Sequence, residues 1–169
     1  KVATLLNESK TARWFALILI SATMFFAYFF VDVVAPLQTM LETDYKWTPE
    51  VFGMLGGSEF FLNVFAFFLI LSGIILDKMG IRFTLITAGI TMVLGAGLKF
   101  YALTPGFQTS GLAEWLNSFL TWVPASAKLA FFGFSIFGIG VEMAGITVSK
   151  TIVKWFKGKE MALAMGLEM

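Results

Sequence analysis

Long apolar runs dominate this sequence and constrain what it can fold into. Four are complete, at about residues 14–36, 51–76, 83–103 and 129–153, and a fifth is partial at 161–169. A helix that crosses a bilayer needs roughly 20 apolar residues at 1.5 Å each. Every complete run is long enough, so the sequence predicts an all-α membrane protein.

Composition and missing motifs narrow the class of function. The chain is 58% hydrophobic and only 14% charged, whereas soluble domains carry about 25% charged residues. Cys and His are absent, which excludes disulfide scaffolds, Cys/His zinc sites and catalysis by a His base. No nucleotide-binding glycine motif is present. We therefore expect no enzyme, no cofactor, no metal and no nucleic-acid partner.

The two ends of the sequence suggest a longer protein. The chain begins at Lys1 rather than Met, and it stops inside an apolar run. We expect residues 1–169 to be a fragment, the N-terminal bundle of a larger transmembrane protein.

Charges between the runs predict the topology. Basic residues gather before the first run, between the second and third, and after the fourth: Lys1, Lys10, Arg13, Lys78, Arg82, Lys150, Lys154, Lys157 and Lys159. The intervening segments hold Glu42, Asp44, Glu50 and Glu114 with only Lys46 and Lys128. The positive-inside rule places the N-terminus in the cytoplasm. We expect a multi-pass protein of the bacterial inner membrane.

Residues 111–123 are too short to span a bilayer but have a helical pattern. Apolar residues recur at i, i+3, i+4, i+7 and i+8: Leu112, Trp115, Leu116, Phe119 and Leu120. Trp115 and Trp122 suit a headgroup interface. The pattern predicts an amphipathic helix along the outer face, and a disordered loop is the alternative.

The fourth run is rich in glycine, with Gly133, Gly138, Gly140 and Gly145. Small residues let helices approach closely in a membrane. We expect close packing here, although glycine is also frequent in membrane helices generally.

A compact motif separates the second and third runs. Residues 73–82 begin with Gly73. They also contain the adjacent pair Asp77 and Lys78, then Gly80 and Arg82, each separated from the one before by a single residue. Gly80 permits a positive φ where the chain reverses. Asp77 lies where it can cap a helix or pair with a base.

This stretch resembles the signature loop of the major facilitator superfamily, between its second and third helices. The resemblance gives Gly73, Asp77, Lys78, Gly80 and Arg82 the role of a conformational gate. Ile81 stands where the family usually has a further base, so its charge network is thinner here.

A narrower resemblance extends over most of residues 28–167. The segments that carry it are 28–32, 36–39, 80–82, 137–142, 155–160 and 166–167, together with Asn63. They resemble the branch of major facilitator superfamily domain-containing protein one, whose members are linked to dipeptide transport. Two departures are the long segment before the fourth run and Phe134, where many members have an Arg.

The resemblance implies a six-helix N-terminal bundle, a missing C-terminal bundle, and alternating access to a central site. The implied partners are a small-molecule substrate and the lipid bilayer. The substrate class implied is a small polar solute, with dipeptides first and organic anions next, and ion symport is a further expectation.

Ionisable residues inside a membrane helix are costly and become site candidates. Glu142 lies near mid-bilayer and is the leading candidate for substrate or proton coupling, with a structural counter-ion as the alternative. The other candidates are Asp32, Glu59, Asn63 and Tyr28. Lys99 and Lys150 lie near helix ends, where a Lys can reach the headgroups.

Two other classes of function stay open. A non-transporting scaffold or receptor does not explain an acid at mid-bilayer. An intramembrane enzyme lacks a nucleophile and base in these residues. Uptake by the full-length protein distinguishes all three.

Overall fold

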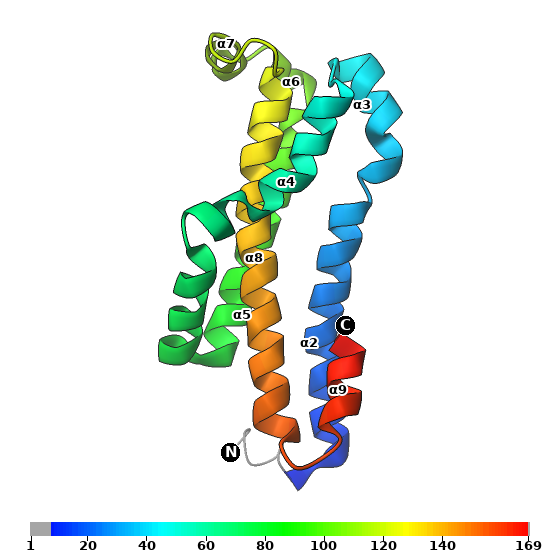
Figure 1. Cartoon of the computed structure of the whole chain (residues 1–169), viewed down its shortest axis with the longest axis vertical. Coiled ribbons are helices and arrows are strands. Elements are labelled where there is room, and N and C mark those ends of the chain that lie inside the picture. The colour runs from blue at the N-terminus through cyan, green and yellow to red at the C-terminus, as the bar shows by residue number, and fades with distance from the viewer. Residues whose placement is uncertain (1–7, 169) are drawn as a thin grey trace.

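The computed structural model of the chain describes residues 8–168, which form helices and no strand. Lys1 and Met169, which the predictions include as a topology anchor and a helix end, lie outside the described residues. The predicted all-α membrane fold is confirmed. Figure 1 shows the long helices running along one common axis, with short helices α6 and α7 at the upper end.

The first long helix, α2, covers Lys10–Asp32. It begins after Ser9, whose hydroxyl accepts a backbone N–H hydrogen bond at 3.3 Å and so caps the first turn. The helix ends one turn before Pro36, which has no N–H to continue the helical hydrogen bonding. A 3-10 turn, η1 (Ala35–Leu37), and helix α3 (Gln38–Tyr45) follow.

The second apolar run, at 51–76, is divided between two helices. Helix α4 covers Pro49–Phe65 and α5 covers Phe68–Ala102, so the run breaks at residues 66–67. Phe67 has a φ of 55°, a left-handed conformation that is uncommon for a residue with a side chain. No glycine or proline marks the break, and the predicted single helix at 51–76 did not include it.

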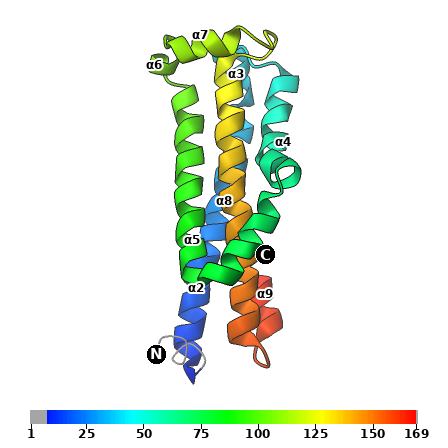
Figure 2. The same ribbon diagram turned by 90° about the vertical axis from the view of Figure 1, so that its left-hand side faces the viewer.

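Gly80 divides α5 at the predicted turn. Its φ of 82° and ψ of 172° are not helical, and only glycine adopts this conformation readily. The part of α5 before Gly80 continues away from α4, and the longer part runs back along the bundle (Figure 2). That longer part contains the third apolar run.

The predicted helix at 111–123 is shorter in the structure. Helix α6 covers Pro105–Gln108 and α7 covers Gly111–Asn117, and both lie across the end of the bundle (Figure 2). The Lys128 ammonium donates to the carbonyl oxygens of Leu116, at 2.6 Å, and of Phe119. A cation that binds the last carbonyl groups ends a helix favourably, which accounts for the stop at Asn117.

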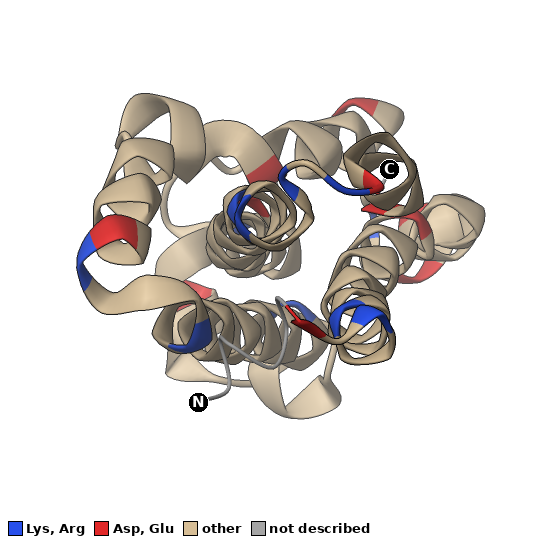
Figure 3. Cartoon of the chain, turned by 90° about the horizontal axis from the view of Figure 1, so that it is seen from below, with Lys and Arg blue, Asp and Glu red and all other residues tan. Residues whose placement is uncertain are grey.

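Helix α8 (Ala125–Phe156) lies at the centre of the bundle, and the short α9 (Met161–Glu168) returns beside it. Figure 3 shows α8 in the middle of the other helices, with basic residues on it and on the loop that follows. Its buried face carries Phe134, Phe137, Val148 and Ile152.

Glycines on α8 allow the predicted close packing. A Cβ atom built on Gly133 would lie 2.8 Å from the carbonyl oxygen of Gly95, and one on Gly140 would lie 2.6 Å from that of Ala88. A Cβ on Gly138 would overlap the backbone of Glu59. Both α5 and α4 therefore approach α8 at distances that only glycine permits.

Three segments are long and apolar enough to cross a membrane: Lys10–Tyr45, Phe68–Ala102 and Ala125–Phe156. Helix α4 has only 17 residues, because the break after Phe65 shortens it. The protein is therefore a multi-pass integral membrane protein. Large apolar side chains cover its outside, including Phe25, Phe65 and Phe100, as a lipid environment or further helices require.

Candidate functional site: charged residues within the bundle

Glu59 lies within electrostatic range of three ionisable residues that come from three other helices. Glu59 on α4 is repelled by Glu142 on α8 and Asp32 on α2, and it is attracted by Lys99 on α5. These residues are up to 110 positions apart in the chain, so only the folded bundle brings them together. The result is a cluster of three acids and one base, which we call the charge cluster.

Glu59 and Asn63 lie on one face of α4, one turn apart, and each is 6% exposed. The Glu59 backbone packs directly on Gly138 of α8. Beside it, the hydroxyl of Ser135 donates to the carbonyl oxygen of Ser58 at 2.6 Å. The Asn63 side-chain amide has no hydrogen-bond partner for either its nitrogen or its oxygen among the described residues. A buried amide without partners is costly, so Asn63 needs a hydrogen-bond partner that residues 8–168 do not supply.

Glu142 is half-buried on α8, between the buried Val141 and Met143. It makes no ion pair with any described residue, and its electrostatic neighbour is Glu59. Two acids within electrostatic range of each other favour binding of a cation or a proton.

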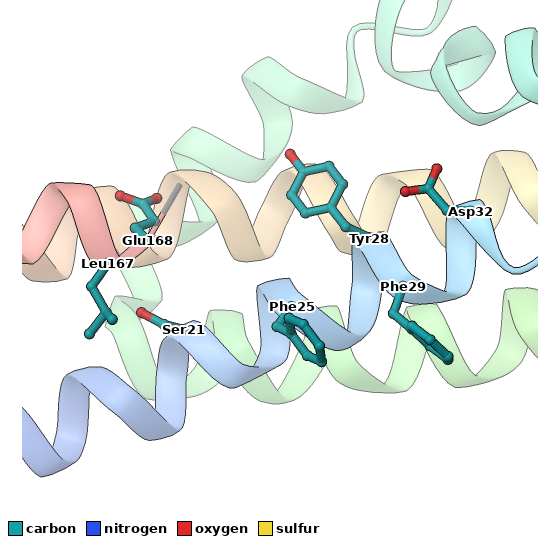
Figure 4. A pocket seen from close by; sticks show the side chains of 7 residues that line it. All are labelled: Ser21, Phe25, Tyr28, Phe29, Asp32, Leu167 and Glu168. Atoms are coloured by element: carbon teal, nitrogen blue, oxygen red, sulfur yellow. The ribbon is translucent and has the colours of Figure 1, made fainter.

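Asp32 and Tyr28 differ from Glu59 because both are exposed. They lie one turn apart and point to the same side of α2, whereas Phe25 and Phe29 point away (Figure 4). A pocket of about 400 Å³ lies along this helix. It is lined by Ser21, Phe25, Tyr28, Phe29, Asp32, Leu167 and Glu168.

Asp32 also reaches a second, smaller pocket between α2 and α4. This space has a volume of about 240 Å³ and is lined by Val34, Phe52, Gly56 and Phe134 among others. Asp32 therefore connects an open face of α2 with the interior of the bundle.

Lys99 is the residue of the charge cluster whose role the sequence did not predict. A Lys near a helix end was expected to reach the headgroups, but here it turns inward and is 8% exposed. Its ammonium lies 4.3 Å from the ring centres of both Phe30 and Phe134. Phe134 stands where the resemblance expects an Arg, and a cation from α5 occupies the same neighbourhood.

The gate loop lies apart from the charge cluster. The Asp77 carboxylate pairs with the Lys150 ammonium at 2.5 Å, which joins α5 to α8. Lys78 and Arg82 are exposed, and neither forms an ion pair within residues 8–168. Of the five predicted gate residues, the structure therefore gives an ion-pair partner to Asp77 alone.

A second group of charges joins the start of α2 to the loop after α8. The Glu160 carboxylate binds the Lys10 ammonium at 2.7 Å and the Arg13 guanidinium at 3.4 Å. Arg13 also lies over the Phe156 ring at 5.1 Å. The hydrogen bond from Lys10, followed by a backbone hydrogen bond, holds the pKa of Glu160 below its ordinary value, and the positive charges of Lys10 and Arg13 add to the effect. From the sequence, only a topological role could be predicted for Lys10 and Arg13, because no sequence pattern places Glu160 beside them.

Comparison with known proteins gives three relatives and no match to a family model or a solved structure. Two are proteins of Pongo abelii and Homo sapiens named lysosomal dipeptide transporter MFSD1, each 30% identical over 158 residues. The third carries the same name in Mus musculus and is 29% identical over 146 residues. The first two alignments cover 93% of this chain but only 30% of each relative, so the chain spans less than a third of the relatives' length.

Proposed function

We propose that the chain is the N-terminal helix bundle of a solute transporter of the major facilitator superfamily, which its similarity to proteins named as dipeptide transporters supports. In this proposal a second bundle, formed by the remainder of the protein, faces the charge cluster. The two bundles rock about a central site and expose it to each side of the membrane in turn.

The charge cluster is the observation that carries the proposal. An acid inside a membrane helix is costly, and of the three acids Glu59 is buried and Glu142 is half-buried, so a purely structural bundle gains little from them. A scaffold or receptor gives no reason for their grouping. An acid-rich interior suits a substrate with a cationic group, or a proton that moves with the substrate.

Dipeptides are the first candidate substrate. The relatives are named as dipeptide transporters, and a dipeptide has the amino terminus that an acidic site would bind. Glu142 is the proposed contact for that amino group or for a coupled proton, with Asp32, Glu59, Asn63 and Tyr28 as further contacts. Organic anions are a weaker candidate, because acids outnumber bases three to one in the cluster.

The comparisons support a membrane location but do not identify which cellular membrane holds the protein. Its relatives are mammalian proteins named for the lysosome, so the comparisons give no support to a bacterial inner membrane. We keep the cytoplasmic N-terminus as part of the proposal, because the basic ends of α2 and α8 lie at the same end of the bundle (Figure 1).

Substrate binding to the full-length protein tests the role of Glu142. If Glu142 stays ionised and binds the amino group, Glu142→Gln should weaken dipeptide binding by roughly 1.5–3 kcal/mol, the scale of a charge-assisted hydrogen bond. If it carries a proton instead, the variant should bind normally and lose the pH dependence of transport. Glu114→Gln, which changes an exposed acid outside the cluster, is the matched control. Wild-type binding and pH response in Glu142→Gln would assign the residue a structural role.

A further inference from the structure

An apolar groove lies on the outside of the bundle, between α4 and α8. Its volume is about 730 Å³, which is in the range of small-molecule sites. None of the four residues of the charge cluster is among those that line it. The lining residues recur three or four positions apart on each helix, so each helix offers one continuous face to the groove. They include Met54, Gly57 and Phe61 on α4 and Phe131, Phe132 and Ser135 on α8.

The groove is open, and its wall is apolar. The Phe61 and Phe132 side chains on its two sides are 54% and 55% exposed. The two serines in the wall have already used their hydroxyl protons. Ser135 donates to the Ser58 carbonyl oxygen and Ser58 donates to the Leu55 carbonyl oxygen, both at 2.6 Å. An occupant of the groove therefore meets a largely apolar wall and no unused hydroxyl donor.

Lys128 lies at one end of this groove, on the same face of α8. It precedes Phe131 and Phe132 by three and four residues, a spacing that places the three side chains on one side of the helix. Its ammonium has three N–H donors, of which two bind the carbonyl oxygens of Leu116 and Phe119. It forms no ion pair with any described residue, and its bond to Phe119 is exposed. One donor and the positive charge are therefore available to an anion.

The position of the groove along the bundle matches one leaflet of a membrane. From Met54 to Leu62 it extends over about 12 Å at 1.5 Å per residue, and half of a hydrocarbon core about 30 Å thick is about 15 Å. Lys128 lies near the start of α8, where that helix reaches the end of the bundle. Trp115 and Trp122 are exposed at the same end, and Trp is enriched at the level of lipid headgroups. The cation therefore lies at headgroup level, and the groove lies at the depth of the acyl chains.

Leu120 adds a wall at the headgroup end of the groove. It belongs to the segment between α7 and α8, which lies across the end of the bundle (Figure 2). The bonds from Lys128 to the carbonyl groups of Leu116 and Phe119 hold this segment in place. A transmembrane helix from the remainder of the protein would have to pass the segment, whereas an acyl chain can end beneath it. The shape of the groove therefore favours a lipid over a further helix.

We propose that this groove binds a phospholipid, with one acyl chain along α4 and α8 and the phosphate on Lys128. The inference goes beyond the proposed transport function, because the lipid site lies outside the charge cluster and does not depend on the identity of the substrate. The phosphate supplies an acceptor for the third donor of Lys128, and the acyl chain covers the exposed apolar walls. The bound lipid then connects α4, α8 and the segment that holds Leu120.

Lipid binding to the full-length protein in detergent tests this site. Native mass spectrometry measures the apparent affinity for the first bound molecule of palmitoyl-oleoyl-phosphatidylglycerol and of palmitoyl-oleoyl-glycerol, which has the same chains but no phosphate. The wild type should prefer the phospholipid by about 5-fold or more, the scale of one basic residue near an anionic membrane surface. Lys128→Gln should abolish that preference. Lys128→Arg, which keeps the charge, and Lys46→Gln, which removes an exposed cation between α3 and α4, should keep it.

A second pair of variants tests the groove itself. No atom lies within 4 Å of a Cβ built on Gly57, so Gly57→Leu has room for its side chain and fills part of the groove. It should weaken the binding of both lipids several-fold, and it provides the test if Lys128→Gln does not fold. Gly89→Leu is the matched control, because its Cβ also meets no atom within 4 Å and it lies on α5, which does not line the groove. It should leave both affinities unchanged.

The inference fails if either half of the site does not respond. A Lys128→Gln protein that still prefers the phospholipid overturns the assignment of the phosphate to Lys128. Wild-type affinity in Gly57→Leu overturns the assignment of the acyl chain, and the groove is then covered by a helix from the remainder of the protein or by a second copy of the chain. Equal losses in Gly57→Leu and Gly89→Leu also contradict it. These results leave the proposed transport function standing, since peptide uptake is measured separately.

Discussion

Asp77 and Lys150 are 73 residues apart in the chain and are joined by an ion pair of 2.5 Å. Asp77 lies on α5 just before the Gly80 turn, and Lys150 lies on α8. The Asp77 side chain is 75% exposed, so the pair is worth little as a source of stability. Its position, away from the charge cluster, suits a contact that forms in one conformation of the transporter and is released in another.

Replacing Asp77 should therefore affect the rate of transport more than binding. In Asp77→Asn the ion pair with Lys150 is lost, which shifts the balance between conformations that the pair distinguishes. We expect slower transport and an equilibrium substrate affinity within a few-fold of the wild type. Transport rates and binding constants of the full-length protein, measured on the same preparations, check this.

The charge exchange Asp77→Lys/Lys150→Asp is the control for that experiment. It restores an ion pair with opposite polarity and should recover part of the rate. Complete loss of binding in a folded Asp77→Asn protein would instead place the gate loop in the substrate site.

The close contact between α4 and α8 depends on Gly138. A methyl group there would overlap the Glu59 backbone, and backbone atoms cannot move aside as a flexible side chain can. Gly138→Ala should destabilise the protein by about 1–3 kcal/mol, the usual cost of overpacking. Thermal unfolding in detergent measures the effect.

Gly145→Ala on the same helix is the matched control. The nearest atom to its new methyl group would be the Met24 Cε at 3.5 Å, an ordinary contact. Equal stability of the two variants would contradict the packing described for α4 and α8.

The group formed by Lys10, Arg13 and Glu160 predicts a pH dependence of stability. The pKa of Glu160 is lowered in the folded protein, chiefly by the hydrogen bond from Lys10. A lowered carboxyl pKa contributes stability that is fully present above the unfolded-state pKa and is lost as pH falls through the folded-state pKa. The wild type should therefore lose more stability than Glu160→Gln when the pH falls below the ordinary pKa of a carboxyl group. Unfolding temperatures of the two proteins across that range test this, and parallel curves would show that the group does not stabilise the fold.

Much of the helical architecture can be predicted from local sequence, and the break at Phe67 is an exception. Apolar length predicts the helices, and the glycine in the signature loop predicts the turn, where Gly80 has a φ of 82°. The break at Phe67 has no such signal, because nothing about a phenylalanine favours a positive φ.

The candidate site was predicted less completely than the fold. Depth within an apolar run identifies Glu142 and Glu59 as buried acids, since burial of charge is rare in a membrane helix. Depth within the run also predicts that Lys99 reaches the lipid headgroups, because the sequence alone does not show which residues lie beside it. Its inward position depends on Phe30 and Phe134, which come from two other helices.

The predicted topology is tested by cysteine labelling, for which the chain is well suited because it has no Cys. Cys at Glu42 or Glu114 should react with an impermeant thiol reagent added outside, since both lie in the segments with few basic residues. Cys at Lys157 should react only after the membrane is permeabilised. The reverse pattern would invert the orientation and the assignment of the gate loop to the cytoplasmic side.

Uptake by the full-length protein in proteoliposomes tests the central claim most directly. Vesicles that contain the wild type should accumulate or exchange a labelled dipeptide with saturable kinetics, and vesicles that contain Glu142→Gln should show either weaker uptake or uptake without its pH dependence. Empty vesicles and vesicles with Glu114→Gln provide the two reference levels. Wild-type vesicles that take up no more dipeptide than empty vesicles would contradict the account.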